Sequence, residues 1–208
     1  MNDLLILGCG GHSGPVYEIT QLEKKWREIF FINDYPLNKE KIHFGCHVLH
    51  GVDSLKKFNV KKTSAFVAIG DNKKRKILFK KLKMIGFKIP NIIHPTSVIS
   101  KDTKILEGNF IGPLVHIGTK VCIGNGNIVN SFANLEHEVK VGSFCQVGPA
   151  ANICGKSILK DGIFIGCNAT VIDNVKIHNH SIIGAGTVIL KSINKPGCKF
   201  VGNPGRKI

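Results

Sequence analysis

The sequence lacks any long apolar stretch. No hydrophobic run approaches the roughly 20 residues that a membrane-spanning helix needs. The short run Leu4 to Leu7 ends in a glycine-rich turn, unlike the apolar core of a signal peptide. With 208 residues, 43% of them hydrophobic, the chain can bury one sizeable core or two small ones. We therefore expect a globular, cytoplasmic protein with no membrane partner.

Paired cysteines are also lacking. The seven cysteines are odd in number and scattered along the chain, and no two are spaced as CxxC. This pattern predicts neither a disulfide framework nor a thiolate zinc site. We expect buried free thiols and no metal.

Acidic residues are few, 14 against 29 Lys and Arg, which gives a net charge of +15 and a pI near 9.6. The excess is spread along the chain, and the densest run, Lys73 to Lys83, has the spacing of a solvated helix face. The charge therefore predicts no nucleic-acid partner. A basic surface of this kind also suits polyphosphate small molecules such as nucleotide sugars or coenzyme A.

Residues 3 to 89 alternate between strand and helix patterns, which indicates a small parallel sheet in a Rossmann-like α/β domain. The expected strands are Leu4 to Leu7, Ile29 to Ile32 and Ala65 to Ile69, and the expected helices are Val16 to Trp26 and Lys73 to Ile85.

The turn GCGGHSG follows the first strand and opens the first helix. Backbone N–H groups at such a place can bind phosphate. The dinucleotide fingerprint GxGxxG is not met, because Ser13 stands where the third glycine belongs and the glycine comes one later, at Gly14. About 90 residues is also only half of a dinucleotide fold. The turn therefore indicates phosphate binding without favouring NAD, although Asp34 ends the second strand where a ribose ligand would lie.

The pattern changes after Pro90. From Ile99 onward every sixth residue is aliphatic, sixteen times without a break. These positions are Ile99, Ile105, Ile111, Ile117, Ile123, Val129, Leu135, Val141, Val147, Ile153, Leu159, Ile165, Val171, Ile177, Ile183 and Ile189. The residue four places after each is usually small or β-branched, and glycine often follows the aliphatic one.

A period of six predicts short strands joined by tight turns in a parallel β-helix. Three hexads make one triangular coil, and coils stack at about 4.8 Å, the spacing of strands in a sheet. Sixteen hexads give just over five coils. We expect a domain at residues 1–90 and a β-helix with a C-terminal cap at residues 91–208. So short a solenoid has exposed edges and flat faces, which predicts a homo-oligomer.

The chain resembles the left-handed β-helix, hexapeptide-repeat nucleotide-sugar acetyltransferases typified by PglD and PerB, with NeuD as a relative. The likeness rests on the hexads together with GCGGHSG, FIND, AIGDNKKR, IHP, GAGTVI and VGNPGRK. It covers essentially the whole chain. It implies a homotrimer with active sites between neighbouring β-helices, acetyl-CoA as the acyl donor, and a UDP- or GDP-linked amino sugar held partly by the N-terminal domain.

His137 lies two residues after the inward Leu135, in the stretch NLEHEVKVG, so we place it in a turn rather than in the core. A neutral imidazole is suited to take the proton from an amine that attacks a thioester. A carboxylate beside it stabilises the imidazolium that forms. In the resembled family this is the next residue, here Glu138, which leaves Glu136 as a solvated bystander.

By the same resemblance, Asn130 matches an asparagine near the catalytic histidine. Gly155 follows His137 by one coil, and it either offers a backbone N–H to the developing oxyanion or is a glycine that the turn requires. Cys145 and Cys154 are close in sequence, but nothing basic is spaced to activate them. We therefore expect direct attack without a covalent intermediate.

The remaining family contacts also transfer by position. Those to acetyl-CoA fall on Gln146, Cys167 and Ala185. Enzymes of the PglD type have a second histidine where this chain has Gln146, which cannot carry a proton. Contacts to the nucleotide sugar fall on Gly10, Gly11, His12, Asn33, Asp34 and Gly70, within GGHS and FIND where the family commonly has GGHG and FLDD.

Three rival functions stay open at this stage. A sialic-acid O-acetyltransferase would use the same His137 base with a hydroxyl acceptor. A γ-carbonic anhydrase needs three converging histidines, whereas His116 and His137 occupy different places in the hexad, and we expect His178 and His180 to be surface residues. A non-catalytic β-helix scaffold predicts no tight binding of acetyl-CoA.

Overall fold

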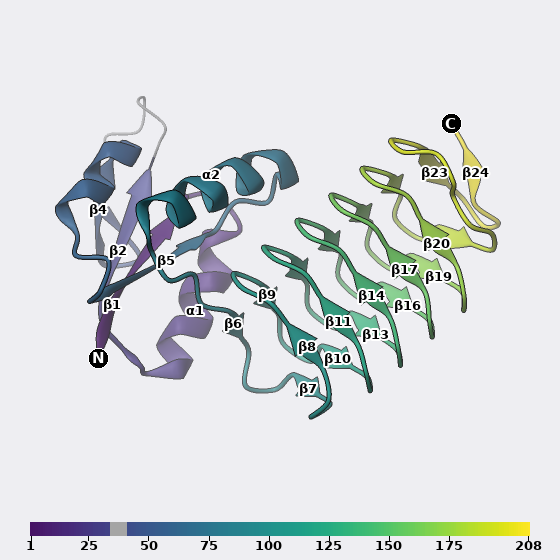
Figure 1. Ribbon diagram of the computed structural model, residues 1–208, viewed down its shortest axis with the longest axis horizontal. Coiled ribbons are helices and arrows are strands. Elements are labelled where there is room, and N and C mark those ends of the chain that lie inside the picture. Colours follow the sequence, from purple (N-terminus) through teal and green to yellow (C-terminus); the bar gives the residue numbers. More distant parts are fainter. Residues whose placement is uncertain (34–40) are drawn as a thin grey trace. The chain divides into compact units, whose positions relative to one another are not determined.

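The computed structural model describes residues 1–33 and 41–208, which fall into two compact units, Met1–Ile92 and Ile93–Ile208. Figure 1 shows an α/β unit and a stack of short strands. Within the described residues, no helix is both long and apolar enough to cross a membrane. Asp34, one of the expected ligand-binding residues, lies outside them.

The N-terminal unit is built on a five-stranded sheet in the order β3-β4-β2-β1-β5. Its strands are β1 (Asn2–Leu7), β2 (Trp26–Asn33), β3 (Ile42–His43), β4 (Cys46–His50) and β5 (Thr63–Val67). All neighbours pair in parallel except β3 with β4. The helices are α1 (Ser13–Glu23) and α2 (Asn72–Ile85), with a 3₁₀ helix η1 (Val52–Lys57). The expected parallel sheet is confirmed.

Three features of this unit differ from the sequence-based expectations. The first helix ends at Glu23 rather than Trp26, because Lys24 takes a left-handed backbone conformation (φ 50°) that stops the helix, and Trp26 then opens β2. The short edge elements β3, β4 and η1 were not expected, since none has a long periodic pattern. The lysine-rich face of α2 is solvated as predicted, but Arg75 on the same helix is buried.

The C-terminal unit is a parallel β-helix of two-residue strands (Figure 1). The strands are β6 (Ile92–Ile93), β7 (Val98–Ile99), β8 (Lys104–Ile105), β9 (Phe110–Ile111), β10 (His116–Ile117), β11 (Cys122–Ile123), β12 (Ile128–Val129), β13 (Asn134–Leu135), β14 (Lys140–Val141), β15 (Gln146–Val147), β16 (Asn152–Ile153), β17 (Ile158–Leu159), β18 (Phe164–Ile165), β19 (Thr170–Val171), β20 (Lys176–Ile177), β21 (Ile182–Ile183) and β22 (Val188–Ile189). Each strand from β7 to β22 ends on one of the sixteen predicted aliphatic residues. A cap of β23 (Lys199–Val201) and β24 (Arg206–Lys207) follows.

Strands eighteen residues apart pair in register, so each coil has three faces. Face I contains β6, β9, β12, β15, β18 and β21 and is continued by the cap strands β23 and β24, face II contains β7, β10, β13, β16, β19 and β22, and face III contains β8, β11, β14, β17 and β20. The chain runs from face I to II to III in every coil. The turns between them form three columns, which we call the I–II, II–III and III–I corners.

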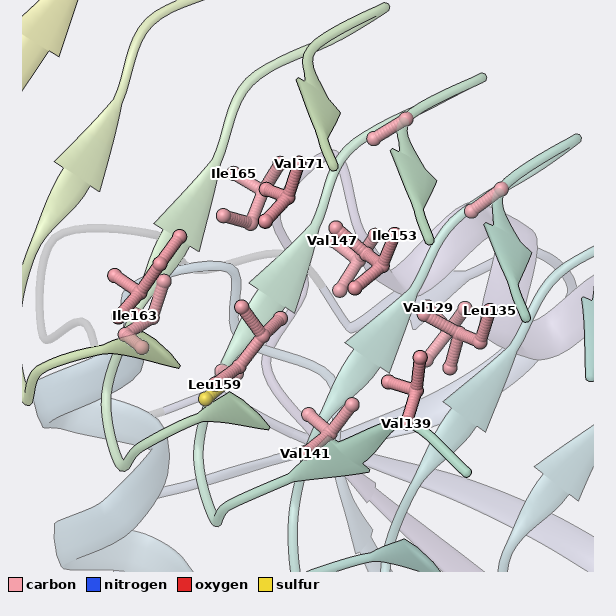
Figure 2. Close-up of a cluster of buried hydrophobic side chains, with 14 of the residues drawn as sticks. Val129, Leu135, Val139, Val141, Val147, Ile153, Leu159, Ile163, Ile165 and Val171 are labelled. Atoms are coloured by element: carbon pink, nitrogen blue, oxygen red, sulfur yellow. The ribbon is translucent and has the colours of Figure 1, made fainter. Parts of the chain in front are cut away.

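The aliphatic side chains point into the coil and stack on one another, as Figure 2 shows for Val129, Leu135 and Val141 and their equivalents in the next coils. Fourteen of the sixteen are buried, and only Ile99 and Ile105, in the first coil, are partly exposed. The small inward residues, such as Ala133 and Ala151, are also fully buried. This core fixes the register of the corners and so positions any residue that lies on them.

All seven cysteines are free thiols, but only Cys145 and Cys198 are buried. The expectation of buried thiols is wrong for the other five, because most of them lie on outward positions of strands or on turns rather than at inward places in the coil. Cys122, for example, is the outward residue of β11, and Cys167 is exposed on a corner.

Candidate active site

The N-terminal unit has a cleft of about 790 Å³ at the carboxyl ends of β1, β2 and β5. It is lined by Leu7, Gly8, Cys9, Gly10, Gly11, His12, Ile32, Asn33, Val52, Ala68, Ile69, Gly70, Asp71, Lys74, Ile77 and Leu78. The chain leaves β1 for β2 on one side and later returns to β5 on the other. Ligands of open α/β sheets bind at such a switch point. Five of the six predicted nucleotide-sugar residues, Gly10, Gly11, His12, Asn33 and Gly70, line this one cleft.

Glycines keep the floor of the cleft open to a ligand. Gly8 has φ +113°, and a Cβ there would meet the Ala68 carbonyl oxygen at 2.9 Å, so no other residue fits. Gly10, Gly11 and Gly70 have nothing within 4 Å of an added Cβ. Their backbone is therefore accessible from the cleft. Gly10 and Gly11 lie just before α1 and Gly70 just before α2, and N–H groups at the start of a helix favour phosphate.

A buried arginine supports the other wall. The guanidinium of Arg75 donates to the carbonyl oxygens of Ile69 (2.9 Å) and Gly70 (2.7 Å) and to Asn72 Oδ1 (2.5 Å). At the start of α2, the Asp71 carboxylate accepts from the Lys74 N–H at 2.8 Å. Sequence reasoning missed Asp71, Asn72, Lys74 and Arg75 as parts of the site, although Asp71 to Arg75 belong to the motif AIGDNKKR. Arg75 fixes the Ile69–Gly70 edge of the cleft.

Burial, together with the positive charge of Arg75, lowers the pKa of His12 from 6.5 to about 4. His12 is therefore a neutral hydrogen-bonding group at neutral pH.

This shift predicts how stability depends on pH. Between pH 6.5 and about 4 the unfolded chain binds a proton at His12 that the folded chain does not, so the free energy of unfolding falls as the pH falls through that window. His12→Gln removes this part of the dependence. Urea unfolding followed by the fluorescence of Trp26, the single tryptophan, measures it. Equal slopes for both proteins between pH 6.5 and 4 would contradict the prediction.

His137 lies on the II–III corner, two residues after the end of β13. Its Nδ1 atom is 3.4 Å from Glu138 Oε1, and the two side chains are 51% and 46% exposed. The contact is long for a hydrogen bond, as is common at catalytic histidines before substrate binds. It directs Nδ1 toward the carboxylate and leaves Nε2 on the other side of the ring.

Gly155 lies one coil further along the same corner, against the imidazole. A Cβ on Gly155 would stand 2.5 Å from His137 Nε2 and 2.6 Å from Cε1. Its φ is not in the left-handed range, so the turn itself does not require glycine. The imidazole requires it, because only a residue without a side chain leaves room for the ring.

Glu136 is not the solvated bystander that the sequence suggested. Its carboxylate accepts a hydrogen bond from Asn134 Nδ2 at 3.0 Å, and Asn134 Oδ1 lies 2.8 Å from His116 Nδ1. This chain of contacts runs along face II to the II–III corner. Sequence reasoning missed it because the hexad pattern fixes which strands are neighbours but not which side-chain atoms of Asn134 and Glu136 contact each other.

The other predicted residues lie elsewhere on the coil. Asn130, Cys167 and Ala185 are on the I–II corner, and Gln146 is on β15 of face I. Asn130 Oδ1 accepts from the Ser131 N–H at 2.9 Å and so caps its own turn. The structure thus brings His137, Glu138 and Gly155 together on the II–III corner. Asn130, Cys167 and Ala185 lie at the opposite end of the face II strands, on the I–II corner, and Gln146 lies on the face I strand before that corner.

Metal ligation is not indicated in the part of the chain that the structure describes, where no group of three His, Cys, Asp or Glu side chains is arranged to hold an ion. His116 is on strand β10 and His137 is on a corner. His180 lies over Gly162 on the III–I corner, and His178 Nδ1 accepts from the Asn179 N–H.

Comparison with known proteins agrees with both units. Residues 3–82 match the PglD N-terminal domain, and residues 156–191 match the bacterial transferase hexapeptide (six repeats). The GDP-perosamine N-acetyltransferase of Escherichia coli O157:H7 is 31% identical over 147 residues, which are 68% of this chain and 66% of that protein.

Two solved structures match the whole fold. The acetyltransferase domain of PglB from Neisseria gonorrhoeae FA1090, in complex with acetyl coenzyme A, is 26% identical with a TM-score of 0.94, and the match covers 100% of each chain. A mutant of perosamine N-acetyltransferase from Caulobacter crescentus, in complex with CoA and GDP-perosamine, is 27% identical with a TM-score of 0.92, over 100% of this chain and 97% of that one. The chain therefore belongs to the PglD-type nucleotide-sugar acetyltransferases, whose hexapeptide repeats form a left-handed β-helix.

Proposed function

We propose that the protein transfers the acetyl group of acetyl-CoA to the amino group of a nucleotide-linked amino-deoxy sugar, of the UDP-4-amino-4,6-dideoxy or GDP-perosamine type. The observation that carries the proposal is the arrangement of His137, with Nδ1 toward Glu138 and Nε2 over Gly155. The relatives named above, which bind CoA, acetyl coenzyme A or GDP-perosamine, support the choice of donor and acceptor.

In this reaction His137 is the general base. The amine attacks the thioester carbonyl, the C–N bond forms, and Nε2 takes a proton from the nitrogen. Glu138 holds the proton of Nδ1, which keeps Nε2 free to accept, and its charge stabilises the imidazolium. The C–S bond then breaks and the imidazolium returns its proton to the leaving thiolate. The Gly155 N–H is our proposed donor to the oxyanion.

No enzyme nucleophile is needed for this sequence. Burial raises the pKa of the Cys154 thiol, and the nearby charges of Asp173 and Glu136 raise it further. Cys154 therefore stays a thiol at neutral pH and is a poor nucleophile. Cys145 is buried, and its thiol donates to the Lys160 carbonyl oxygen at 3.0 Å.

We propose a homotrimer as the active form. Within one chain the catalytic corner and the residues matched to acetyl-CoA, Gln146, Cys167 and Ala185, lie at different places around the coil. A neighbouring copy that presents its I–II corner to the II–III corner of the first completes the site, with Asn130 orienting the base or the acceptor. In the N-terminal cleft, Gly10, Gly11, His12, Asn33 and Gly70 hold the nucleotide sugar, with Asp34 as a further proposed contact.

The test is release of free thiol from acetyl-CoA by the purified protein. The acceptors offered in parallel are a UDP-4-amino-4,6-dideoxy sugar, GDP-perosamine and a sialic acid. We expect rapid release with one amino sugar, which also identifies the nucleotide. Thiol release with the sialic acid alone would indicate O-acetylation in place of the proposed N-acetylation. Tight binding of acetyl-CoA without thiol release in the presence of any of the three acceptors would contradict the proposal.

Glu138→Gln tests the charge of the Glu138 side chain separately from its packing at this turn. The amide keeps the size of the side chain but loses the charge that stabilises the imidazolium. Because both side chains are about half exposed, we expect a fall in kcat of roughly tenfold to a hundredfold, less than for a fully buried carboxylate partner. The control is Glu107→Gln, on another corner. Equal kcat for Glu138→Gln and the wild type would contradict the role given to Glu138.

A further inference from the structure

Asp173 lies on the II–III corner one coil beyond Gly155 and two coils beyond His137. The point where a Cβ of Gly155 would stand is 2.5 Å from His137 Nε2 and 3.2 Å from Asp173 Oδ1. The imidazole nitrogen and the carboxylate oxygen therefore approach the same small space from the coils on either side. Asp173 is exposed, and within residues 1–33 and 41–208 no group donates a hydrogen bond to its carboxylate.

A second carboxylate, that of Glu136, lies on the same corner. Cys154 precedes Gly155, and the charges of both Asp173 and Glu136 raise the pKa of its thiol. Glu136 is fixed in place by Asn134 at 3.0 Å, which in turn contacts His116. With Glu138 at Nδ1, these three carboxylates lie on the corner that carries the His137 imidazole. The cations on this corner, Lys101, Lys120, Lys156 and Lys191, are exposed side chains.

An amine and a hydroxyl make different demands on such a site. An aliphatic amine is largely an ammonium ion near neutral pH, so it must lose two protons to become an amide, whereas a hydroxyl loses one to become an ester. His137 accepts one proton and returns it to the departing thiolate. The second proton of an ammonium acceptor needs another group, and Asp173 is the carboxylate that shares the space of Nε2.

We propose that Asp173 binds the acceptor as an ammonium ion and removes its first proton, which makes the site specific for amines. The inference rests on the proposed function. One N–H bond breaks toward Asp173, the free amine attacks the thioester carbon, and the second N–H proton passes through His137 to the thiolate. The sum is an ammonium ion and acetyl-CoA giving an amide, free CoA and one proton released through Asp173 to solvent.

The same charges select against the rival acceptor class. A sialic acid has its own carboxylate and a neutral hydroxyl, so it gains no ion pair with Asp173. It is also repelled by Glu136 and Glu138. Specificity for amines would then come from the corner that performs the chemistry, while the N-terminal cleft recognises the nucleotide.

The experiment compares wild type with Asp173→Asn on the best amino-sugar acceptor, from pH 6 to 9.5. We expect KM to rise roughly tenfold or more near pH 7, where the acceptor is an ammonium ion. The difference should shrink as the pH rises and the amine becomes neutral. Asp173→Glu should restore part of the binding. The matched control is Asp161→Asn, an aspartate on the III–I corner that accepts from the Ser143 N–H.

An unchanged KM and an unchanged pH profile for Asp173→Asn, in a protein that acetylates the amino sugar, would overturn the inference alone. Equal loss at all pH values would overturn it too, because that pattern indicates a structural effect. A wild type that acetylates no amino sugar would overturn the proposed function and this inference with it. The two failures are therefore distinguishable in one set of assays.

Discussion

His137→Ala is expected to lower kcat by roughly 10²- to 10⁴-fold, the loss typical of removing a general base. The imidazole is half exposed and makes no part of the coil core, so the β-helix should remain folded. Thiol release at saturating substrates measures the effect. The acetyl-CoA concentration at half-maximal rate should change far less than kcat, since the imidazole acts in the transition state.

The chain has a matched control for this change. His180 also lies over a glycine, Gly162, on the III–I corner. His180→Ala therefore removes an imidazole from an equivalent setting in the fold but away from the catalytic corner, and we expect wild-type turnover. If His137→Ala and His180→Ala had the same activity, the assignment of His137 as the base would be wrong.

Gly155→Ala is expected to cost roughly a hundredfold in turnover. The new Cβ would stand 2.5 Å from His137 Nε2, so the ring must move by about an ångström. Displacement of a catalytic group by that distance is enough for a loss of this size. The backbone N–H is kept in this variant, so the effect reports on the position of the imidazole rather than on loss of an oxyanion donor.

A double mutant decides whether the imidazole is the cause. If Gly155→Ala acts by moving the ring, it should have little further effect in a protein that already carries His137→Ala. Independent losses that multiply would show that Gly155 acts by another route. Thermal unfolding of the single and double mutants checks that the coil is intact.

The β-helix followed from the sequence because its core repeats. One aliphatic side chain every six residues is both the sequence pattern and the cause of the stacked core, so all sixteen strands could be placed in advance. The short edge strands β3 and β4 have no such pattern. They are held by pairing with one another and with β2, which is a tertiary effect.

The candidate site could be predicted in part. The spacing of eighteen residues placed Gly155 beside His137. It did not show that the imidazole approaches so closely that only glycine fits there. Sequence reasoning also treated Glu136 as solvated, because its partner Asn134 is identified only by side-chain geometry. Asp173 was not noticed, since nothing in its own hexad departs from a common turn. The approach of the Asp173 carboxylate to the space beside His137 depends on the side-chain positions in adjacent coils, which the hexad pattern does not give.

The most direct test of the account is the chemical identity of the product. The wild-type protein is incubated with acetyl-CoA and the amino sugar that supports thiol release, and the acetylated sugar is treated with hydroxylamine, which cleaves esters and leaves amides intact. We predict a product that resists hydroxylamine, with the acetyl group on nitrogen by NMR. A hydroxylamine-sensitive acetyl group on a sugar oxygen would contradict the account.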